Sequence, residues 1–202
     1  MEPVKESGRG GTTKVTEEEI RAATHGVAET FFDTRHSVRQ FTDLAVDRQL
    51  IEESLKRAQR TPSVCNRQCA RVHVLTDSKA KAKALSFQNG NRGFGSQASV
   101  IFIVTADLSV FTDAGERFQG WIDGGMYAMS LVYALHSLGL GSCTLNWSVA
   151  PGIDRRMRSA LNIPENELVI MMIAAGHIPD SFKVASSPRL PVEVTTRFVT
   201  ET

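Results

Sequence analysis

The sequence predicts one α/β or α+β domain, a sandwich in which helices cover a small sheet. Two apolar runs, residues 100–104 and 168–175, are typical of strands buried on both faces. Helical patterns lie between the strands along the chain, so sheet and helices should pack in layers. With 202 residues, of which 42% are hydrophobic, the chain is long enough for one well-buried core and short for two.

Composition and charge exclude several function classes. The formal net charge of +1 gives no field that would attract nucleic acid or an anionic membrane. The cysteines Cys65, Cys69 and Cys143 show neither a CxxC pair nor a His-rich metal spacing, so we expect free thiols and no metal site. Residues 1–6 lack the apolar core of a secretory signal, and the longest apolar stretch, residues 126–140, is too short to cross a bilayer. We therefore expect a cytoplasmic protein with no nucleic-acid or membrane partner.

The N-terminal region divides into an arm and a helix. Residues 1–14 are rich in Gly, Ser and charge and should form a flexible arm, which leaves residues 15–202 as the single domain. Thr16 followed by Glu19 is a capping box, so a helix should begin there and deliver the chain to Arg35.

A basic segment follows this helix. Arg35, Ser37 and Arg39 supply charge-assisted donors for an anionic ligand. Taken alone, the segment is equally consistent with a solvated basic turn, because cations also favour a helix C-terminus.

A polar loop ends the second predicted helix, which Asp47 can cap. Within residues 61–68, the short side chains of Ser63, Asn66 and Gln68 can hydrogen-bond a planar heterocycle or a ribityl chain without adding bulk. An ordinary Pro-Ser-Asn turn is the alternative, and this segment alone favours it.

The rest of the chain alternates strands and helices. We expect strands over residues 72–75, 100–104, 143–147 and 168–175, helices over 79–87 and from Pro151, a turn at 89–91, and a short connection over 107–117. The tail over residues 194–199 is β-prone and has no partner nearby in the sequence. Such a tail can add a strand to another subunit's sheet.

The helix predicted over residues 118–138 is apolar on nearly every side, and Asp123 is its only charge before His136. Such a helix has to be buried all round. In a small domain, the simplest solution buries one face against a second subunit, where Gly124 and Gly125 would let backbones approach closely. A core helix of a monomer is the alternative.

Four segments in this order resemble the nitroreductase family of FMN-dependent oxidoreductases: residues 35–41, 61–68, 138–142 and 188–191. The likeness extends over nearly the whole chain beyond Thr16. It implies an α+β three-layer sandwich with a central mixed sheet flanked by helices. It also implies a homodimer with two FMN sites at its interface, each built from both subunits, and a C-terminal tail exchanged between them.

The resemblance assigns roles to particular residues. Arg35 would hold the phosphate, Ser37 the phosphate or ribityl chain, and Arg39 the pyrimidine edge of the isoalloxazine. A fixed cation at that edge stabilises the negative charge that reduction places around N1 and O2, so Arg39 would act electrostatically while flavin N5 carries the hydride. The complete set of implied cofactor-binding residues is Arg35, His36, Ser37, Arg39, Pro62, Ser63, Asn66, Gln68, Asn91, Thr144, Leu145, Asn146, Trp147 and Arg189.

Within that set, Pro62 to Gln68 would come from the partner subunit and Asn91 would read the ring edge. A backbone N–H in residues 144–147 would lie near N5, and Arg189 would be a second phosphate ligand. Three positions depart from the family pattern: Cys69 stands where proline is usual, and Phe94 and Ser187 stand where basic residues are common. Fewer cations imply weaker flavin binding or a less stabilised reduced form.

The implied activity is reduction of electron-poor small molecules, such as nitroaromatics, quinones or enones, by NAD(P)H through a ping-pong cycle. The chain has no GxGxxG motif that would help to choose between NADH and NADPH. Two alternatives stay open. One is a dehalogenating or flavin-fragmenting enzyme, although the short connection over residues 107–117 argues against the lid that dehalogenating relatives close. The other is a non-catalytic or flavin-free homodimer.

Overall fold

The computed structural model describes residues 15–24 and 28–200, so the arm predicted over residues 1–14 lies outside the described residues. The chain separates into two compact units, Met1–Arg35 and His36–Thr202. The first unit holds α1 (Glu17–Thr24) and α2 (Ala28–Asp33), where the sequence predicted one helix. The backbone N–H of Thr16 donates to Glu19 Oε2 at 2.8 Å, and that of Glu19 donates to Thr16 Oγ1 at 3.2 Å, which confirms the capping box.

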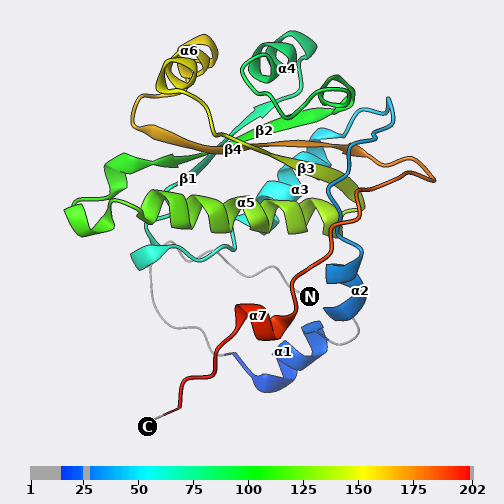
Figure 1. The fold of residues 1–202 in the computed structure, drawn as a ribbon, viewed down its shortest axis with the longest axis vertical. Coiled ribbons are helices and arrows are strands. Elements are labelled where there is room, and N and C mark those ends of the chain that lie inside the picture. The colour runs from blue at the N-terminus through cyan, green and yellow to red at the C-terminus, as the bar shows by residue number, and fades with distance from the viewer. Residues whose placement is uncertain (1–14, 25–27, 201–202) are drawn as a thin grey trace. The chain divides into compact units, whose positions relative to one another are not determined.

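The second unit is built on a four-stranded sheet in the order β1-β2-β4-β3 (Figure 1). Its strands are β1 (Ala70–Leu75), β2 (Val100–Asp107), β3 (Leu140–Asn146) and β4 (Glu167–His177). All three pairings are antiparallel, so the expectation of a mixed sheet is wrong for these strands. A parallel contact occurs as one bridge between Ser37 and Ser142. Periodicity marks a strand but not its direction, which depends on how the connections return the chain.

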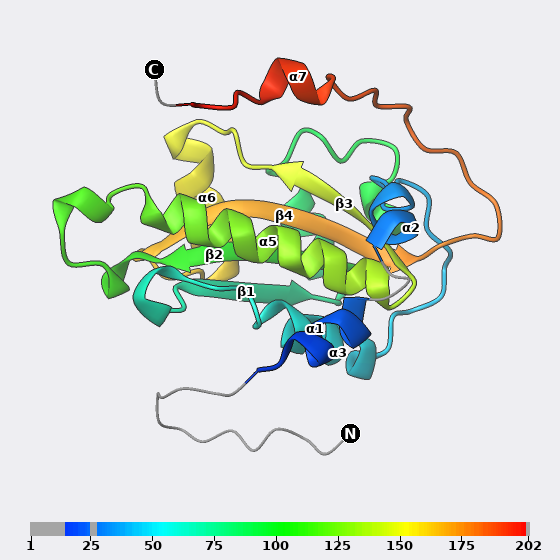
Figure 2. The ribbon, with the colours of Figure 1, turned by 90° about the horizontal axis from the view of Figure 1, so that it is seen from below.

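Helices cover both faces of the sheet, which confirms the three-layer α+β sandwich. The α4 helix (Ser78–Leu85) and α6 (Pro151–Leu161) lie on one face, and α3 (Arg48–Ala58) and α5 (Gln119–Ser137) lie on the other (Figure 1). Figure 2, which views the molecule from below, shows α5 running along the sheet on the side nearer the viewer. Side chains alternate along β2, so Phe102 packs into the α5 layer while Ile101 and Ile103 pack into the layer of α4 and α6.

Short helical turns complete the unit: the 3₁₀ helices η1 (Val64–Asn66), η2 (Gly95–Gln97), η3 (Leu108–Val110) and η4 (Ala114–Glu116), and the C-terminal α7 (Val192–Thr195). In the part of the chain that the structure describes, no helix is both long and apolar enough to span a membrane. The β-prone tail is not a strand. It contains the end of α7, and Phe198 and Val199 are 94% and 95% exposed, because β propensity needs a neighbouring strand to take effect.

The two faces of α5 differ sharply. A Cβ on Gly124 would lie 2.6 Å from Ile170 Cγ1, so the helix packs against β4 at a distance that requires glycine. A Cβ on Gly125 would meet nothing within 4 Å. The outward face carries exposed apolar side chains, which we call the outer stripe: Trp121, Ile122, Met126 and Met129. A single chain therefore does not bury this helix on every side, which argues against the monomeric core helix.

Candidate functional site

The segment after Arg35 lies along the outer edge of β3. The backbone N–H of Val38 donates to the Ser142 carbonyl at 2.8 Å, and that of Thr42 donates to the His177 carbonyl at 2.9 Å. The Val38 side chain is buried, which fixes the segment, while His36 and Arg39 are exposed and Ser37 is half-buried. Arg35 belongs to the first unit, whereas the other predicted site residues belong to the second.

Arg39 is oriented by an aromatic ring. Its guanidinium carbon lies 5.9 Å from the centroid of the buried Phe94 ring, a cation–π contact that stabilises this arrangement by about 0.5–1 kcal/mol at an exposed site. Burial raises the pKa of the Cys143 thiol, and the nearby Arg39 guanidinium offsets part of that rise. Phe94, which stands where the family often has a second basic residue, thus holds Arg39, the cation predicted to lie beside the flavin.

The end of β3 presents backbone donors on the same edge. Backbone groups of alternate residues in a strand point to one edge, so the Ser142 bond to Val38 places the N–H groups of Thr144 and Asn146 on the outer edge too. The side chains of Thr144 and Asn146 are exposed, whereas Leu145 is 3% exposed and packs into the core. Trp147 is half-buried, and its indole N–H donates to Asp154 Oδ1 at 2.8 Å.

Gln88 is a buried polar residue that the sequence reasoning missed. Its Nε2 donates to the Asn146 carbonyl at 3.1 Å, and its Oε1 accepts the Gly90 N–H at 2.6 Å, so it ties the end of β3 to the turn at residues 88–91. Asn91 Nδ2 donates to the Leu85 carbonyl at 2.9 Å and to the Gln88 carbonyl, which closes the same turn. The role of Asn91 at a ring edge stays a prediction. No periodicity marks a residue such as Gln88.

The loop before β1 holds three non-glycine residues in the left-handed region. Cys65, Asn66 and Gln68 have φ of 48°, 54° and 48°, a conformation that costs energy and persists only where neighbours impose it. Ser63 is one such neighbour, since its Oγ accepts the Gln68 N–H at 2.9 Å. Asp123 on α5 is another, since its Oδ2 accepts the Val64 N–H at 3.1 Å. The loop is therefore held in one shape by side chains.

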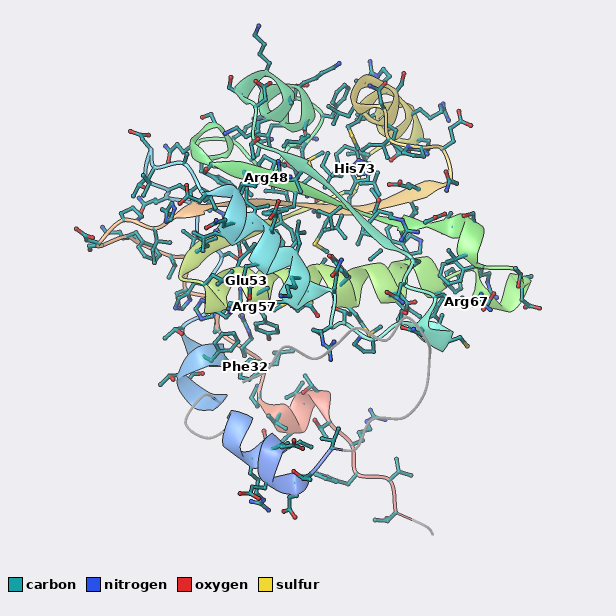
Figure 3. The ribbon with its side chains drawn as sticks, turned by 180° about the vertical axis from the view of Figure 1, so that it is seen from behind. Phe32, Arg48, Glu53, Arg57, Arg67 and His73 are labelled. Atoms are coloured by element: carbon teal, nitrogen blue, oxygen red, sulfur yellow. The ribbon has the colours of Figure 1, made fainter. Side chains whose placement is uncertain are left out.

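The short connection between β2 and α5 is pinned to this loop. Arg67 lies near the start of α5 (Figure 3), and its Nη1 is 2.6 Å from Glu116 Oε1 and donates to the Val110 carbonyl at 3.1 Å. The hydrogen bond from Arg67 and those from the Thr112 and Asp113 N–H groups hold the pKa of Glu116 below its ordinary value. This ion pair, whose side chains are both half-buried, fixes the short connection at residues 107–117.

The predicted residues fall into two groups at opposite edges of the sheet. Residues 36–39 lie beside β3 and residues 144–146 form its end, whereas residues 62–68 lead into β1. Three strand spacings separate β1 from β3, which is on the order of 14 Å. The exposed Arg189 donates to the Ser187 carbonyl, and no hydrogen bond between described residues joins it to either group.

Among the described residues, no cluster of three or more His, Cys, Asp or Glu side chains could hold a metal ion. All three cysteines are free; Cys65 is exposed, and Cys69 and Cys143 are buried.

Comparisons with known proteins agree with the resemblance. The sequence model described as the nitroreductase family matches residues 33–89 and 79–177. A Bacillus subtilis protein named FMN reductase (NAD(P)H) is 26% identical over 172 residues, which cover 78% of this chain and 67% of the relative. A nitroreductase family protein of Streptococcus pneumoniae has a TM-score of 0.72 at 20% identity, covering 83% of this chain and 97% of its own. An FMN-dependent nitroreductase of Clostridium difficile has a TM-score of 0.67 at 21% identity, covering 77% and 90%. Because the family model spans most of the chain, this protein belongs to the nitroreductase family.

Proposed function

We propose that this chain is an FMN-dependent oxidoreductase that uses NAD(P)H to reduce electron-poor acceptors, such as nitroaromatics, quinones or enones, in a ping-pong cycle. Family membership supports this proposal, as do the names of the Bacillus subtilis and Clostridium difficile relatives. When bound, FMN supplies hydride transfer between the donor and the acceptor.

The observation that carries the proposal is the outer edge of β3. There a cation, Arg39, lies next to a strand whose Thr144 and Asn146 N–H groups point outward. Outward N–H donors suit the carbonyl oxygens and ring nitrogens of a planar heterocycle, and a fixed cation suits a ring that becomes more negative on reduction. These residues therefore fit the flavin. Arg39 stabilises the negative charge, and the β3 donors orient the ring.

We further propose that the working form is a homodimer whose sites take residues from both chains. The 62–68 loop and the Arg39 segment lie at opposite edges of one sheet, so the two groups of one chain do not meet around one flavin ring. A second copy can bring the two groups together, and the outer stripe of α5 offers an apolar surface to hold it. Ser63 and Asn66 would then reach the flavin held by the partner's Arg39 segment, while Ser37 and Arg189 would bind its phosphate.

The absorption spectrum of the purified protein tests this function. We expect a flavin band that bleaches when NADH or NADPH is added without oxygen and returns when a quinone follows. An Arg39→Gln variant should bind FMN more weakly, whereas Arg48→Gln, which breaks an exposed pair with Glu52 on α3, should not. A colourless protein that gains no flavin band with added FMN would refute the proposal that FMN is its cofactor. A flavin that neither nicotinamide bleaches would favour the non-catalytic homodimer.

A further inference from the structure

The turn after α4 is built around a buried amide. Gln88 is only 6% exposed, and its backbone N–H donates to the Leu85 carbonyl at 3.1 Å, where α4 ends. Its Oε1 accepts the Gly90 N–H at 2.6 Å, and a Cβ on Gly90 would lie 3.2 Å from its Nε2. Burying an amide is costly unless its donor and its acceptor are both paired. This side chain is therefore held in one position by hydrogen bonds and by close packing.

The donor end of this amide reaches the strand end that is proposed to face the flavin. Gln88 Nε2 donates to the Asn146 carbonyl at 3.1 Å. The N–H and the carbonyl of one strand residue point to the same edge, so the amide lies beside the outward N–H of Asn146. A hydrogen bond to a carbonyl also polarises its peptide group, which makes the N–H of that group, here that of Trp147, a stronger donor. Gln88 thus fixes the direction and the strength of donors at the end of β3.

The acceptor end of the amide holds the turn that carries Phe94. Asn91 Nδ2 donates to the Gln88 carbonyl and lies 3.3 Å from Gln88 Oε1. The Asn91 carbonyl accepts the N–H groups of Phe94 and Gly95 at 3.3 and 2.8 Å. Phe94 in turn holds Arg39 through its ring. One buried side chain therefore connects the β3 donors with the cation predicted to lie beside the flavin.

We propose that Gln88 is a positioning residue for the flavin, acting through Asn146 and through the turn that ends at Phe94. It sets how tightly FMN binds and how far the reduced form is stabilised. Donors and cations stabilise a developing charge best when they are held in place beforehand, and Gln88 holds both kinds without adding a charge of its own. The inference rests on the proposed function, because it requires FMN at the outer edge of β3.

Fluorescence titration with FMN and the two-electron midpoint potential of the bound flavin test this role in the full chain. Gln88→Leu removes the donor and the acceptor without adding a charge, and we expect it to bind oxidised FMN about tenfold more weakly. The reduced form should lose about a further tenfold, because it also depends on Arg39, and this lowers the midpoint potential by about 30 mV. Gln97→Leu, the same change at an exposed glutamine of η2, should alter neither quantity.

Gln88→Glu tests the hydrogen bond to β3 by itself. At pH 8 its carboxylate can accept from the Gly90 N–H but cannot donate to the Asn146 carbonyl. A protonated carboxyl group can do both, so at pH 5 most of the lost FMN affinity should return, relative to the unaltered chain at the same pH. This comparison of one protein at two pH values does not depend on whether Gln88→Leu folds. Urea denaturation at each pH checks that Gln88→Glu is folded.

Equal FMN affinity and equal midpoint potential in the unaltered chain and both Gln88 variants would overturn the positioning role and leave the proposed function standing. A loss in Gln88→Leu that Gln88→Glu does not recover at pH 5 would also overturn it, because the volume of the side chain would then matter and not its hydrogen bond. An unaltered chain that binds no FMN would refute the proposed function and this inference together.

Discussion

Glutamate in place of Ile122 tests whether the functional site is shared between two chains. Ile122 lies in the outer stripe and is 52% exposed, so in a single chain the change should alter the free energy of unfolding by no more than about 0.5 kcal/mol. In a dimer that covers this stripe, each chain loses about 1 kcal/mol of apolar burial. Burying the added carboxyl group in the interface without a partner costs at least about 1–3 kcal/mol more. Summed over two copies, dimerisation should weaken by roughly a thousandfold or more.

Sedimentation equilibrium and FMN absorbance, measured at the same protein concentration, check this outcome. We expect Ile122→Glu to sediment as a monomer, to lose FMN and to keep the urea denaturation midpoint of an isolated folded chain. Leu44→Glu is the matched control, because Leu44 is 63% exposed and lies outside α5. An Ile122→Glu protein that stays dimeric and retains its flavin would refute the assignment of the stripe to the interface, as would equal dissociation of the control.

Three further changes probe the packing, the thiols and the pinned connection. Gly124→Ala should lower the free energy of unfolding by about 1–3 kcal/mol, because the added Cβ would meet Ile170. Gly125→Ala should raise the free energy of unfolding of the isolated chain by up to about 1 kcal/mol, because its Cβ would meet nothing and alanine favours a helix. Urea denaturation measures both changes. At pH 8, iodoacetamide should alkylate Cys69 at least about a hundredfold more slowly than Cys65, followed by mass spectrometry, because burial and the charge of Asp123 raise the pKa of the Cys69 thiol to about 11. Hydrogen bonding to Arg67 lowers the pKa of Glu116. The pair's contribution to the free energy of unfolding is therefore complete at pH values above 4.5, the ordinary pKa of a glutamate, and is lost as the pH falls below that value. Amide exchange at residues 112 and 113 of the connection should then speed up relative to exchange in the sheet.

Each of these expectations has an outcome that contradicts it. Equal effects of alanine at the two glycines would show that α5 does not lie as close to β4 as described. Labelling of Cys69 as fast as Cys65 would mean that its thiol is neither buried nor next to a negative charge. A pH-independent exchange pattern at residues 112–113, or the same pattern in Arg67→Gln, would remove the ion pair as the element that pins the connection.

The sequence predicted those elements whose signal is local. Thr16 and Glu19 form the expected capping box, and the four predicted strands lie within or close to β1 to β4. The run at residues 100–104 is fully buried because its side chains enter two different cores, as a continuous apolar pattern indicates.

The features that the sequence did not predict depend on partners far along the chain. The mixed sheet that the resemblance implies is not found among β1 to β4, because strand direction is set by the connections and has no local signal. Gln88 carries no pattern of its own, and its importance comes from the Asn146 carbonyl, which is 58 residues away. Asp123 was visible as a lone charge, but its contact with Val64 arises only when α5 packs beside the loop. The tail at residues 194–199 is not a strand in the single chain for a related reason, since its propensity requires a neighbouring strand, and its exchange between subunits stays a prediction.

The placement of the two residue groups at opposite edges of one sheet has a genetic consequence in the proposed dimer. A chain altered at Arg39 and a chain altered at Asn66 each spoil both sites of their own homodimer. In a mixed dimer, one site combines both altered segments and the other combines both intact ones. Co-expression of two inactive variants should therefore restore activity to about a quarter of the original level, since half of randomly formed dimers are mixed and each has one complete site. Complementation of this kind is a signature of a shared site that neither parent homodimer can display.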